Sequence, residues 1–168
     1  MPIVVSDTSP IRALSHLGCL SLLHSLFGEV LIPPAVVAEL ERPRSKLPSL
    51  VVQGLAFVRV QAPQDRRLVG EFLGSLELGE AEALALAIEV RADALLIDEA
   101  AGRAVARQRG LLPIGALGIL VRARQRGLVG ALLPLLDRLQ SELGFFISPS
   151  LRSTVLNRAE DPGEQTES

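Results

Sequence analysis

Two aspartates each follow a short apolar run, in positions from which they could bind a metal or transfer protons. Asp7 ends "PIVVSD" and Asp98 ends "ALLID". A segment with the apolar spacing of a helix follows each run, so each run is predicted to be a strand that leads into a helix. The carboxyl ends of parallel strands lie at one edge of a sheet, where open α/β sheets bind ligands. We therefore expect Asp7 and Asp98 to share that edge.

Two glutamates are expected at the same edge. Glu39 lies in a helix that leaves another apolar run through two prolines. Glu80 opens the helix that leads toward the run before Asp98, and at about 100° per residue it shares a face with Leu84. Glu82 falls on the opposite side of this helix. We predict that Glu80 points inward and that Glu82 is solvated.

Each acid taken alone has a simpler explanation. Asp7 and Asp98 could cap the helices that follow them. Glu80 could complement a helix dipole, and Glu39 could flank an amphipathic helix. Taken together, carboxylates that converge on one edge with no lysine nearby would repel one another unless a divalent cation bound between them. Hard oxygen ligands favour Mg²⁺ or Mn²⁺, ions that support phosphodiester hydrolysis.

The elements that would position these acids alternate along the chain. Short apolar runs at 2–6, 29–32, 56–60, 94–97 and 112–115 are predicted to be strands. The segments 10–28, 33–43, 79–92 and 99–110 have apolar spacings of three and four, which predict helices. This alternation is typical of a parallel α/β fold with about five strands. Residues 41–55 are predicted to form a surface loop or short helix.

The C-terminal part of the chain is predicted to add helices to this sheet. From about residue 116 no further strand is evident, and two or three helices are expected, the last capped by Ser148 with Pro149 in its first turn. We predict a single domain over residues 1–158. The polar and acidic residues 159–168 are predicted to be a disordered tail.

Composition narrows the class of protein. The 168 residues are 48% hydrophobic, enough for a core, and the net charge is -2. Residues 91–138 nevertheless hold eight arginines against four acids. With no Trp, no Tyr and five Phe, contacts to nucleic acid are expected mainly at phosphates. The single cysteine excludes a disulfide framework, and no apolar stretch reaches the roughly 18 residues of a membrane span. We expect a cytoplasmic protein.

Four motifs together resemble a known family. "VVSDTSPI", "LIPPAVVAEL", "LGEAEALALA" and "ALLIDEAAGRAVARQRGLLPIGALGIL" are similar to successive motifs of the PIN domain, in a branch of small prokaryotic PIN proteins, and the resemblance covers residues 3 to about 157. It implies a PIN-like fold and an Mg²⁺- or Mn²⁺-dependent ribonuclease. It also implies metal ligands and catalytic residues at Asp7, Glu39, Glu80 and Asp98, with the Ser9 hydroxyl helping to hold the first aspartate.

The chain departs from the family pattern at two positions. Many PIN nucleases have aspartate where this chain has Glu80, and threonine where it has Leu96. The first change moves a carboxylate by one methylene, and the second removes a hydroxyl. The alternative function is therefore a catalytically weak or inactive PIN-like module that binds nucleic acid or regulates. Ser9 precedes Pro10, so a role as a helix cap stays open.

The same resemblance suggests partners. Many PIN proteins are toxins of type II toxin-antitoxin pairs that dimerise, so RNA, a cognate antitoxin and a second copy of the chain are expected partners. The leucine-rich segment "LVGALLPLLDRL" also favours a homodimer. Arg12, Arg103 and Arg107 are candidates for contacts to RNA phosphates.

Overall fold

The computed structural model describes residues 1–43 and 47–161. These residues form an α/β fold around a five-stranded, fully parallel sheet of order β3-β2-β1-β4-β5. The strands are β1 (Val4–Ser6), β2 (Val30–Ile32), β3 (Val58–Val60), β4 (Ala94–Leu96) and β5 (Pro113–Ile114). Each lies within a predicted apolar run and is one or two residues shorter. The predicted fold class is confirmed.

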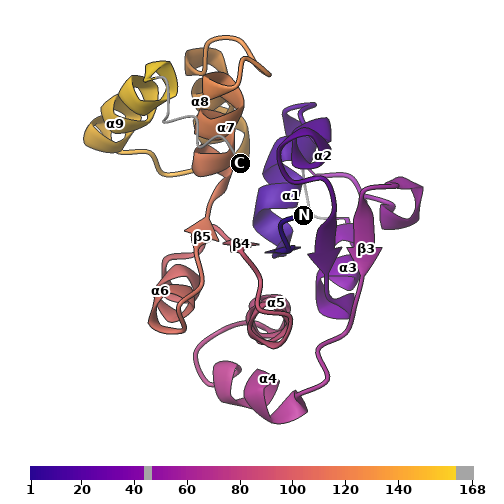
Figure 1. The fold of residues 1–168 in the computed structure, drawn as a ribbon. Coiled ribbons are helices and arrows are strands. Elements are labelled where there is room, and N and C mark those ends of the chain that lie inside the picture. The colour runs from indigo at the N-terminus through magenta and orange to yellow at the C-terminus, as the bar shows by residue number, and fades with distance from the viewer. Residues whose placement is uncertain (44–46, 162–168) are drawn as a thin grey trace.

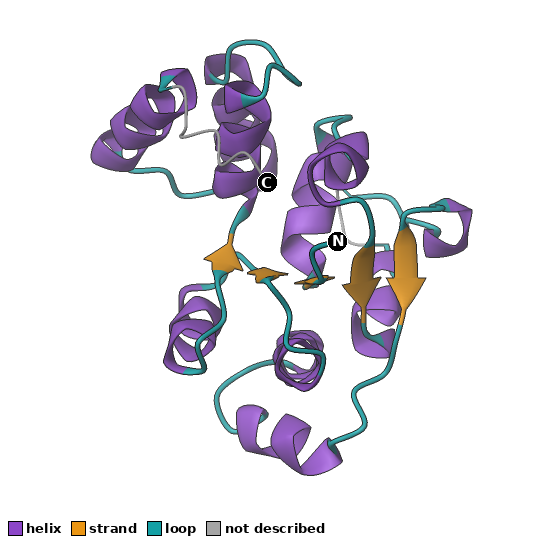
Figure 2. Ribbon diagram, viewed as in Figure 1, coloured by secondary structure: helices purple, strands orange, loops and turns teal. Residues whose placement is uncertain are grey.

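Helices cover both faces of this sheet (Figures 1 and 2). They are α1 (Thr8–His16), α2 (Ser21–Phe27), α3 (Pro34–Glu41), α4 (Arg66–Phe72), α5 (Leu78–Glu89), α6 (Ala100–Gln108), α7 (Ala116–Gln125), α8 (Leu133–Leu143) and α9 (Pro149–Glu160). A single 3₁₀ turn, η1 (Val52–Gly54), lies in the predicted surface segment 41–55, of which residues 44–46 lie outside the described residues.

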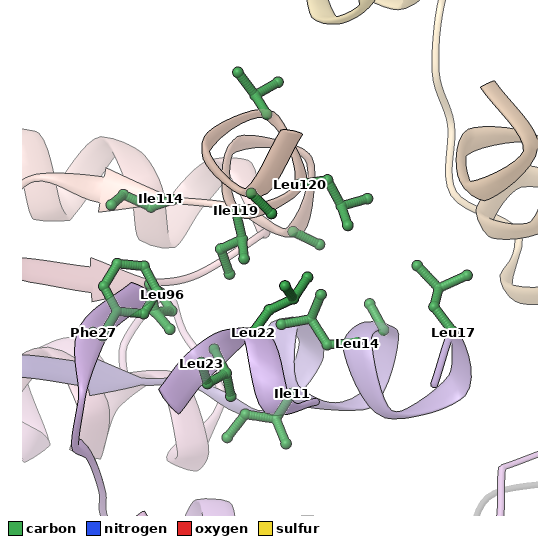
Figure 3. Packing of buried hydrophobic residues seen from close by; sticks show 14 of the residues in the cluster. Ile11, Leu14, Leu17, Leu22, Leu23, Phe27, Leu96, Ile114, Ile119 and Leu120 are labelled. Atoms are coloured by element: carbon green, nitrogen blue, oxygen red, sulfur yellow. The ribbon is translucent and has the colours of Figure 1, made fainter. Parts of the chain in front are cut away.

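Neighbouring residues of β1 point to opposite faces of the sheet and belong to two apolar clusters. Val4 packs with residues of α1, α2, α3 and α7, and Figure 3 shows part of this cluster around Ile11, Leu96 and Ile119. Val5 packs on the other face, with α4, α5 and α6. The strand is therefore buried on both sides, as expected of a parallel sheet.

The predicted helical segment 10–28 is two helices rather than one. Gly18 has a φ of 71°, and the Cys19 N–H donates to the carbonyl of Leu14 at 2.8 Å. This is a Schellman turn, which glycine adopts without the steric cost of a Cβ. Helix α4 was not predicted, because its seven residues are too few to show a helical period. Its N-cap, Asp65, accepts from the Leu68 N–H at 3.2 Å.

The C-terminal helices pack on the face that carries α1 and α7. Ser148 caps α9 by accepting from the Leu151 N–H at 3.1 Å, and Pro149 begins the helix, as predicted. Helix α9 continues to Glu160, and Ala159 is buried in the core. The ordered chain thus extends past the predicted boundary at residue 158. Residues 162–168 of the predicted tail lie outside the described residues.

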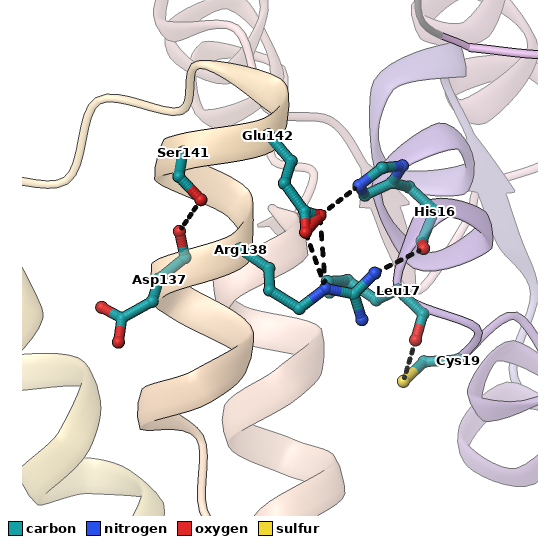
Figure 4. A network of polar contacts seen from close by, with 7 residues as sticks. All are labelled: His16, Leu17, Cys19, Asp137, Arg138, Ser141 and Glu142. Carbon is teal, nitrogen blue, oxygen red and sulfur yellow. Dashed lines mark hydrogen bonds and ion pairs between the residues drawn. The ribbon is translucent and has the colours of Figure 1, made fainter.

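A polar contact also joins α8 to α1 (Figure 4). The Glu142 carboxylate lies 2.9 Å from His16 Nε2 and 3.1 Å from Arg138 Nε. Arg138 also donates to the His16 carbonyl at 3.2 Å. This His16–Arg138–Glu142 contact holds the C-terminal end of α8 beside α1. Among the described residues, no helix is long and apolar enough to cross a membrane.

Candidate active site

The predicted acids lie where the order of the sheet reverses. The chain runs from β1 through β2 to β3 on one side, then returns to β4 and β5 on the other side of β1. Asp7 directly follows β1, and Asp98 lies two residues after β4. Helices α1 and α7 begin at the same edge. This is the topological switch point at which open α/β sheets place ligands.

Asp7 is the buried acid of this edge. Its side chain is 3% exposed, and no described residue is a hydrogen-bond partner for its Oδ1 oxygen. It occupies the N-cap position of α1 without a side-chain capping bond, so its carboxylate does not serve as a helix cap. Burial raises the pKa of Asp7 from 3.8 to about 7, against the lowering effect of the Thr8 N–H. The nearby carboxylates of Glu80, Glu39 and Asp98 contribute to this rise.

Asp98 is held by two hydrogen bonds. Its Oδ2 accepts from the Ser9 hydroxyl at 2.7 Å, and its Oδ1 accepts from the Ala116 N–H at 2.8 Å. Burial raises the pKa of Asp98, while these two donors and Arg103 lower it. Asp98 therefore joins the start of α7 to the start of α1. Ser9 holds this last aspartate, whereas the family resemblance implied a role toward the first.

Glu39 and Glu80 approach Asp7 from helices that pack against each other. The Thr8 hydroxyl donates to Glu39 Oε2, which fixes the carboxylate of α3 against the start of α1. Glu80 lies in the first turn of α5 and is half-buried. Burial raises the pKa of Glu80 to about 7, and the carboxylates of Glu99, Glu77 and Glu39 add to the shift.

Three glycines leave room for three of these carboxylates. A Cβ on Gly79 would lie 2.5 Å from Glu39 Oε1. A Cβ on Gly102 would lie 3.0 Å from Glu80 Oε2, and one on Gly115 would lie 2.8 Å from Asp98 Oδ1. Any larger residue at these positions would have to displace the neighbouring side chains, among them the carboxylates of Glu39, Glu80 and Asp98. The backbone is therefore shaped around the acids.

The acids face a small cavity, here called the acidic cavity. Its volume is about 230 Å³. Its acidic lining residues are Asp7, Glu39, Glu77, Glu80 and Glu99. Glu77 and Glu99 were not predicted. Glu77 is the N-cap residue of α5, the helix that carries Glu80, and Glu99 is the N-cap residue of α6, the helix that follows Asp98.

The carboxylates line this cavity without forming a ready-made metal cluster. Among the described residues, no group of three Asp, Glu, His or Cys side chains is arranged to hold a metal ion. The Glu39 carboxylate accepts a hydrogen bond from Thr8, and the Asp98 carboxylate accepts one from Ser9. The donor chemistry still fits a hard divalent cation, because all donors are carboxylate oxygens and one of them, Asp7 Oδ1, is buried with no hydrogen-bond partner in the part of the chain that the structure describes.

The prediction for Glu82 was wrong. Its side chain is 5% exposed, accepts from the Ala35 N–H at 2.9 Å and pairs with Arg66 at 2.8 Å. Glu80 and Glu82 do point to opposite sides of α5, but α5 is covered on both sides, by α3 and α4 among others. Glu82 therefore stabilises the start of α3, away from the acidic cavity.

The predicted arginines differ in their surroundings. Arg12 is 8% exposed and donates to the carbonyls of Glu39 and Arg42, so it joins α1 to the end of α3 rather than facing solvent. Arg103 is half-buried beside Asp98 and donates to the Ile97 carbonyl at 3.1 Å. Arg107 is exposed one turn further along α6. Arg103 and Arg107 remain candidates for contacts to phosphates.

Comparison with protein families gives a match to the chain. The model of the PIN domain matches residues 3–161. The chain belongs to the PIN-domain family. No curated protein is similar enough to the chain to count as a match. PIN domains are generally nucleases, so the chain has a nuclease-like fold.

Proposed function

We propose that this PIN domain is an Mg²⁺- or Mn²⁺-dependent endoribonuclease that hydrolyses RNA phosphodiester bonds. The observation that supports it most is Asp7, a buried carboxylate with one unpartnered oxygen, surrounded by the carboxylates of Glu39, Glu80 and Asp98. Desolvation and like charges make this arrangement costly when it is ionised. A bound cation would offset that cost.

Asp7, Glu39, Glu80 and Asp98 would hold the cation. When bound, Mg²⁺ or Mn²⁺ would lower the pKa of a water nucleophile and stabilise the leaving oxygen. The chain itself contributes orientation: Ser9 and the Ala116 N–H fix Asp98, and Thr8 fixes Glu39.

Arginines beside the acids would attract the substrate. Arg103 lies close enough to Asp98 for each to affect the pKa of the other, and Arg107 follows on the same helix. Their positive charges offset the repulsion that an acidic cavity would exert on a polyanion. We propose them as contacts to phosphates that flank the cleaved bond.

The test is cleavage of a mixed single-stranded RNA by the purified chain, with Mn²⁺ and with chelator. We expect cleavage by the wild type in Mn²⁺ only, and none by Glu80→Gln. Glu82→Gln is the matched control, because it changes the same residue type two positions away but outside the cavity. Equal cleavage by both variants, or cleavage in chelator, would contradict the proposal.

A second candidate is a PIN-like module that binds nucleic acid with little or no turnover. Two observations favour it: Leu96 provides no hydroxyl near Asp98, and no described residues form a ready metal cluster. Binding of RNA without any cleavage, in wild type and Glu80→Gln alike, would support this candidate.

We further propose a cytoplasmic toxin that pairs with an antitoxin. Expression should arrest growth, Glu80→Gln should not, and the product of a neighbouring small open reading frame should relieve the arrest. Growth arrest that persists with Glu80→Gln would contradict a nuclease toxin.

A homodimer is also proposed, but only part of the leucine-rich segment is exposed for a second copy to contact. Leu132, Leu136 and Leu139 of the leucine-rich segment are buried within a single chain, while Leu128 and Leu133 are exposed. Light scattering at micromolar concentration distinguishes the two states, and a monomeric mass would contradict the dimer.

A further inference from the structure

A second and larger cavity adjoins the acidic cavity and differs from it in charge. Its volume is about 830 Å³, and it lies between the edge of the sheet, α7, α9 and the loop that joins α8 to α9. The two cavities share four lining residues, Ser9, Glu99, Leu143 and Phe145. A chain molecule bound in one cavity would therefore continue directly into the other.

Arginines from three helices line this larger cavity, here called the arginine cavity. They are Arg103 from α6, Arg122 from α7 and Arg158 from α9. Asp98 also lines this cavity, and Glu99 lines both cavities. The arginine cavity therefore has more arginines and fewer acids in its lining than the acidic cavity.

Arg122 and Arg158 have no carboxylate partner among the described residues. Arg66, Arg124, Arg138 and Arg152 each pair with a carboxylate. Within residues 1–43 and 47–161, neither Arg122 nor Arg158 has such a pair; Arg122 donates to the Gly118 carbonyl at 3.2 Å instead. Burial and the nearby Arg158 lower the pKa of Arg122. Two like charges that face one cavity favour an anion between them.

Phe146 provides an aromatic surface at the same cavity. It lines the arginine cavity, lies in the loop between α8 and α9, and is 90% exposed. The neighbouring Phe145 is half-buried and packs against the core. A fully exposed phenylalanine beside an anion-binding cavity is the combination that single-stranded nucleic acids use, since a base can stack on the ring while a phosphate is held nearby.

We propose that the arginine cavity is the subsite for a nucleotide next to the cleaved bond, with Arg122 and Arg158 holding its phosphate and Phe146 stacking on its base. The volume exceeds what a phosphate alone would fill, and the direct continuation into the acidic cavity fits a polymer. The ligand is single-stranded RNA, because a paired base is not free to stack on a side chain. This assignment deepens the proposed nuclease function and rests on it for the position of the cleaved bond.

Binding is tested separately from cleavage. Fluorescence anisotropy with a labelled, mixed-sequence single-stranded RNA is measured in chelator, for the full chain. We expect Arg122→Gln combined with Arg158→Gln to weaken binding at least tenfold and to reduce the slope of log K against log salt by about one. Phe146→Ala should weaken binding about 5- to 100-fold without changing that slope.

Matched controls come from the same helices. Arg126→Gln removes an exposed arginine at the end of α7, and Leu133→Ala removes an exposed apolar side chain of α8; both lie outside the cavity lining. Neither should change the affinity by more than about twofold, and unchanged circular dichroism melts show that each variant folds. A perfectly paired duplex RNA should show no dependence on Phe146.

The outcomes separate the subsite from the nuclease. RNA binding that depends on these three residues, in a protein that never cleaves RNA, would support the subsite and contradict the nuclease. Metal-dependent cleavage with binding unaffected by the three substitutions would overturn the subsite alone. Binding of a polyglutamate peptide that needs both arginines but not Phe146, with RNA binding insensitive to them, would also overturn it, because the cavity would then serve an acidic protein segment.

Discussion

Replacing Asp7 by asparagine should change the stability of the metal-free protein in opposite directions at low and high pH. In the folded protein the pKa of Asp7 is about 7, against 3.8 for the ordinary residue. The folded state therefore binds this proton more tightly than the unfolded state. Stability from this group is present below pH 4 and is lost as the pH rises to 7. Asparagine cannot ionise, so the variant does not lose it.

The size of the effect follows from the shift. A difference of about three pH units corresponds to about 4 kcal/mol, at about 1.36 kcal/mol per unit. The asparagine amide places a polar group where Asp7 Oδ1 has no partner among the described residues, which costs about 1–2 kcal/mol. We expect the variant to be about 2–3 kcal/mol more stable than wild type at pH 8, and about 1–2 kcal/mol less stable at pH 4.

Urea unfolding in chelator at pH 4, 6 and 8 measures this difference. Far-ultraviolet circular dichroism is the signal, because the chain has no Trp and no Tyr. Asp161→Asn, an exposed residue at the end of α9, is the control and should follow the wild type at every pH. Curves for Asp7→Asn that run parallel to the wild type would refute the argument that burial and neighbouring carboxylates strain Asp7.

Addition of Mn²⁺ should reverse the order of stability. A ligand that binds only the folded state stabilises by RT ln(1 + [L]/Kd), so wild type should gain several degrees in Tm and Asp7→Asn much less. The gain of the wild type should decrease below about pH 7, because protons compete for Asp7 and Glu80. An equal gain in both proteins would show that Asp7 is not a ligand.

Further substitutions separate stability from activity. Gly79→Ala should displace the Glu39 carboxylate and lower the rate of RNA cleavage at least tenfold, while the Tm stays unchanged or rises slightly. Gly70→Ala is the control: its Cβ would lie in open space, so it should reduce neither cleavage nor folding. Glu82→Ala should lower the free energy of unfolding by about 1–3 kcal/mol in urea titrations without affecting cleavage per folded molecule. Ser9→Ala should shift the acid limb of the pH–rate profile upward, since it removes a hydrogen bond that lowers the pKa of an aspartate; an unchanged profile would mean that this aspartate does not limit the rate.

The strands could be predicted because their sequences are almost wholly apolar and short. Val4, Val5 and Leu95 are buried on the two faces of one sheet, and only a parallel sheet covered on both sides gives such a pattern. The division of 10–28 into two helices was not predicted because Gly18 interrupts the chain without interrupting the apolar spacing. Helix α4 was missed because a helix of seven residues depends on its Asp65 cap and on packing against α5.

The acids at the edge could be placed in order, but their partners could not. Helical geometry correctly separates Glu80 from Glu82, yet which side of a helix meets water depends on the elements that pack around it. Ser9 lies two residues after Asp7 in the sequence but contacts Asp98, because β1 and β4 are neighbours in the sheet. Arg158 lies 36 residues beyond Arg122, and only the packing of α9 on α7 brings both to one cavity.

We expect the polar contact between α8 and α1 to weaken as the ionic strength rises. His16, Arg138 and Glu142 all reach solvent, so salt screens their attraction, whereas the apolar packing of α9 on α7 is not weakened in this way. Two residues after Glu142 the chain turns at Gly144 into the loop that borders both cavities. We expect amide hydrogen exchange at the end of α8 to accelerate with added salt, while exchange in α7 stays constant. The ions that compete with RNA for the arginines would then also weaken the packing of the end of α8, beside the arginine cavity.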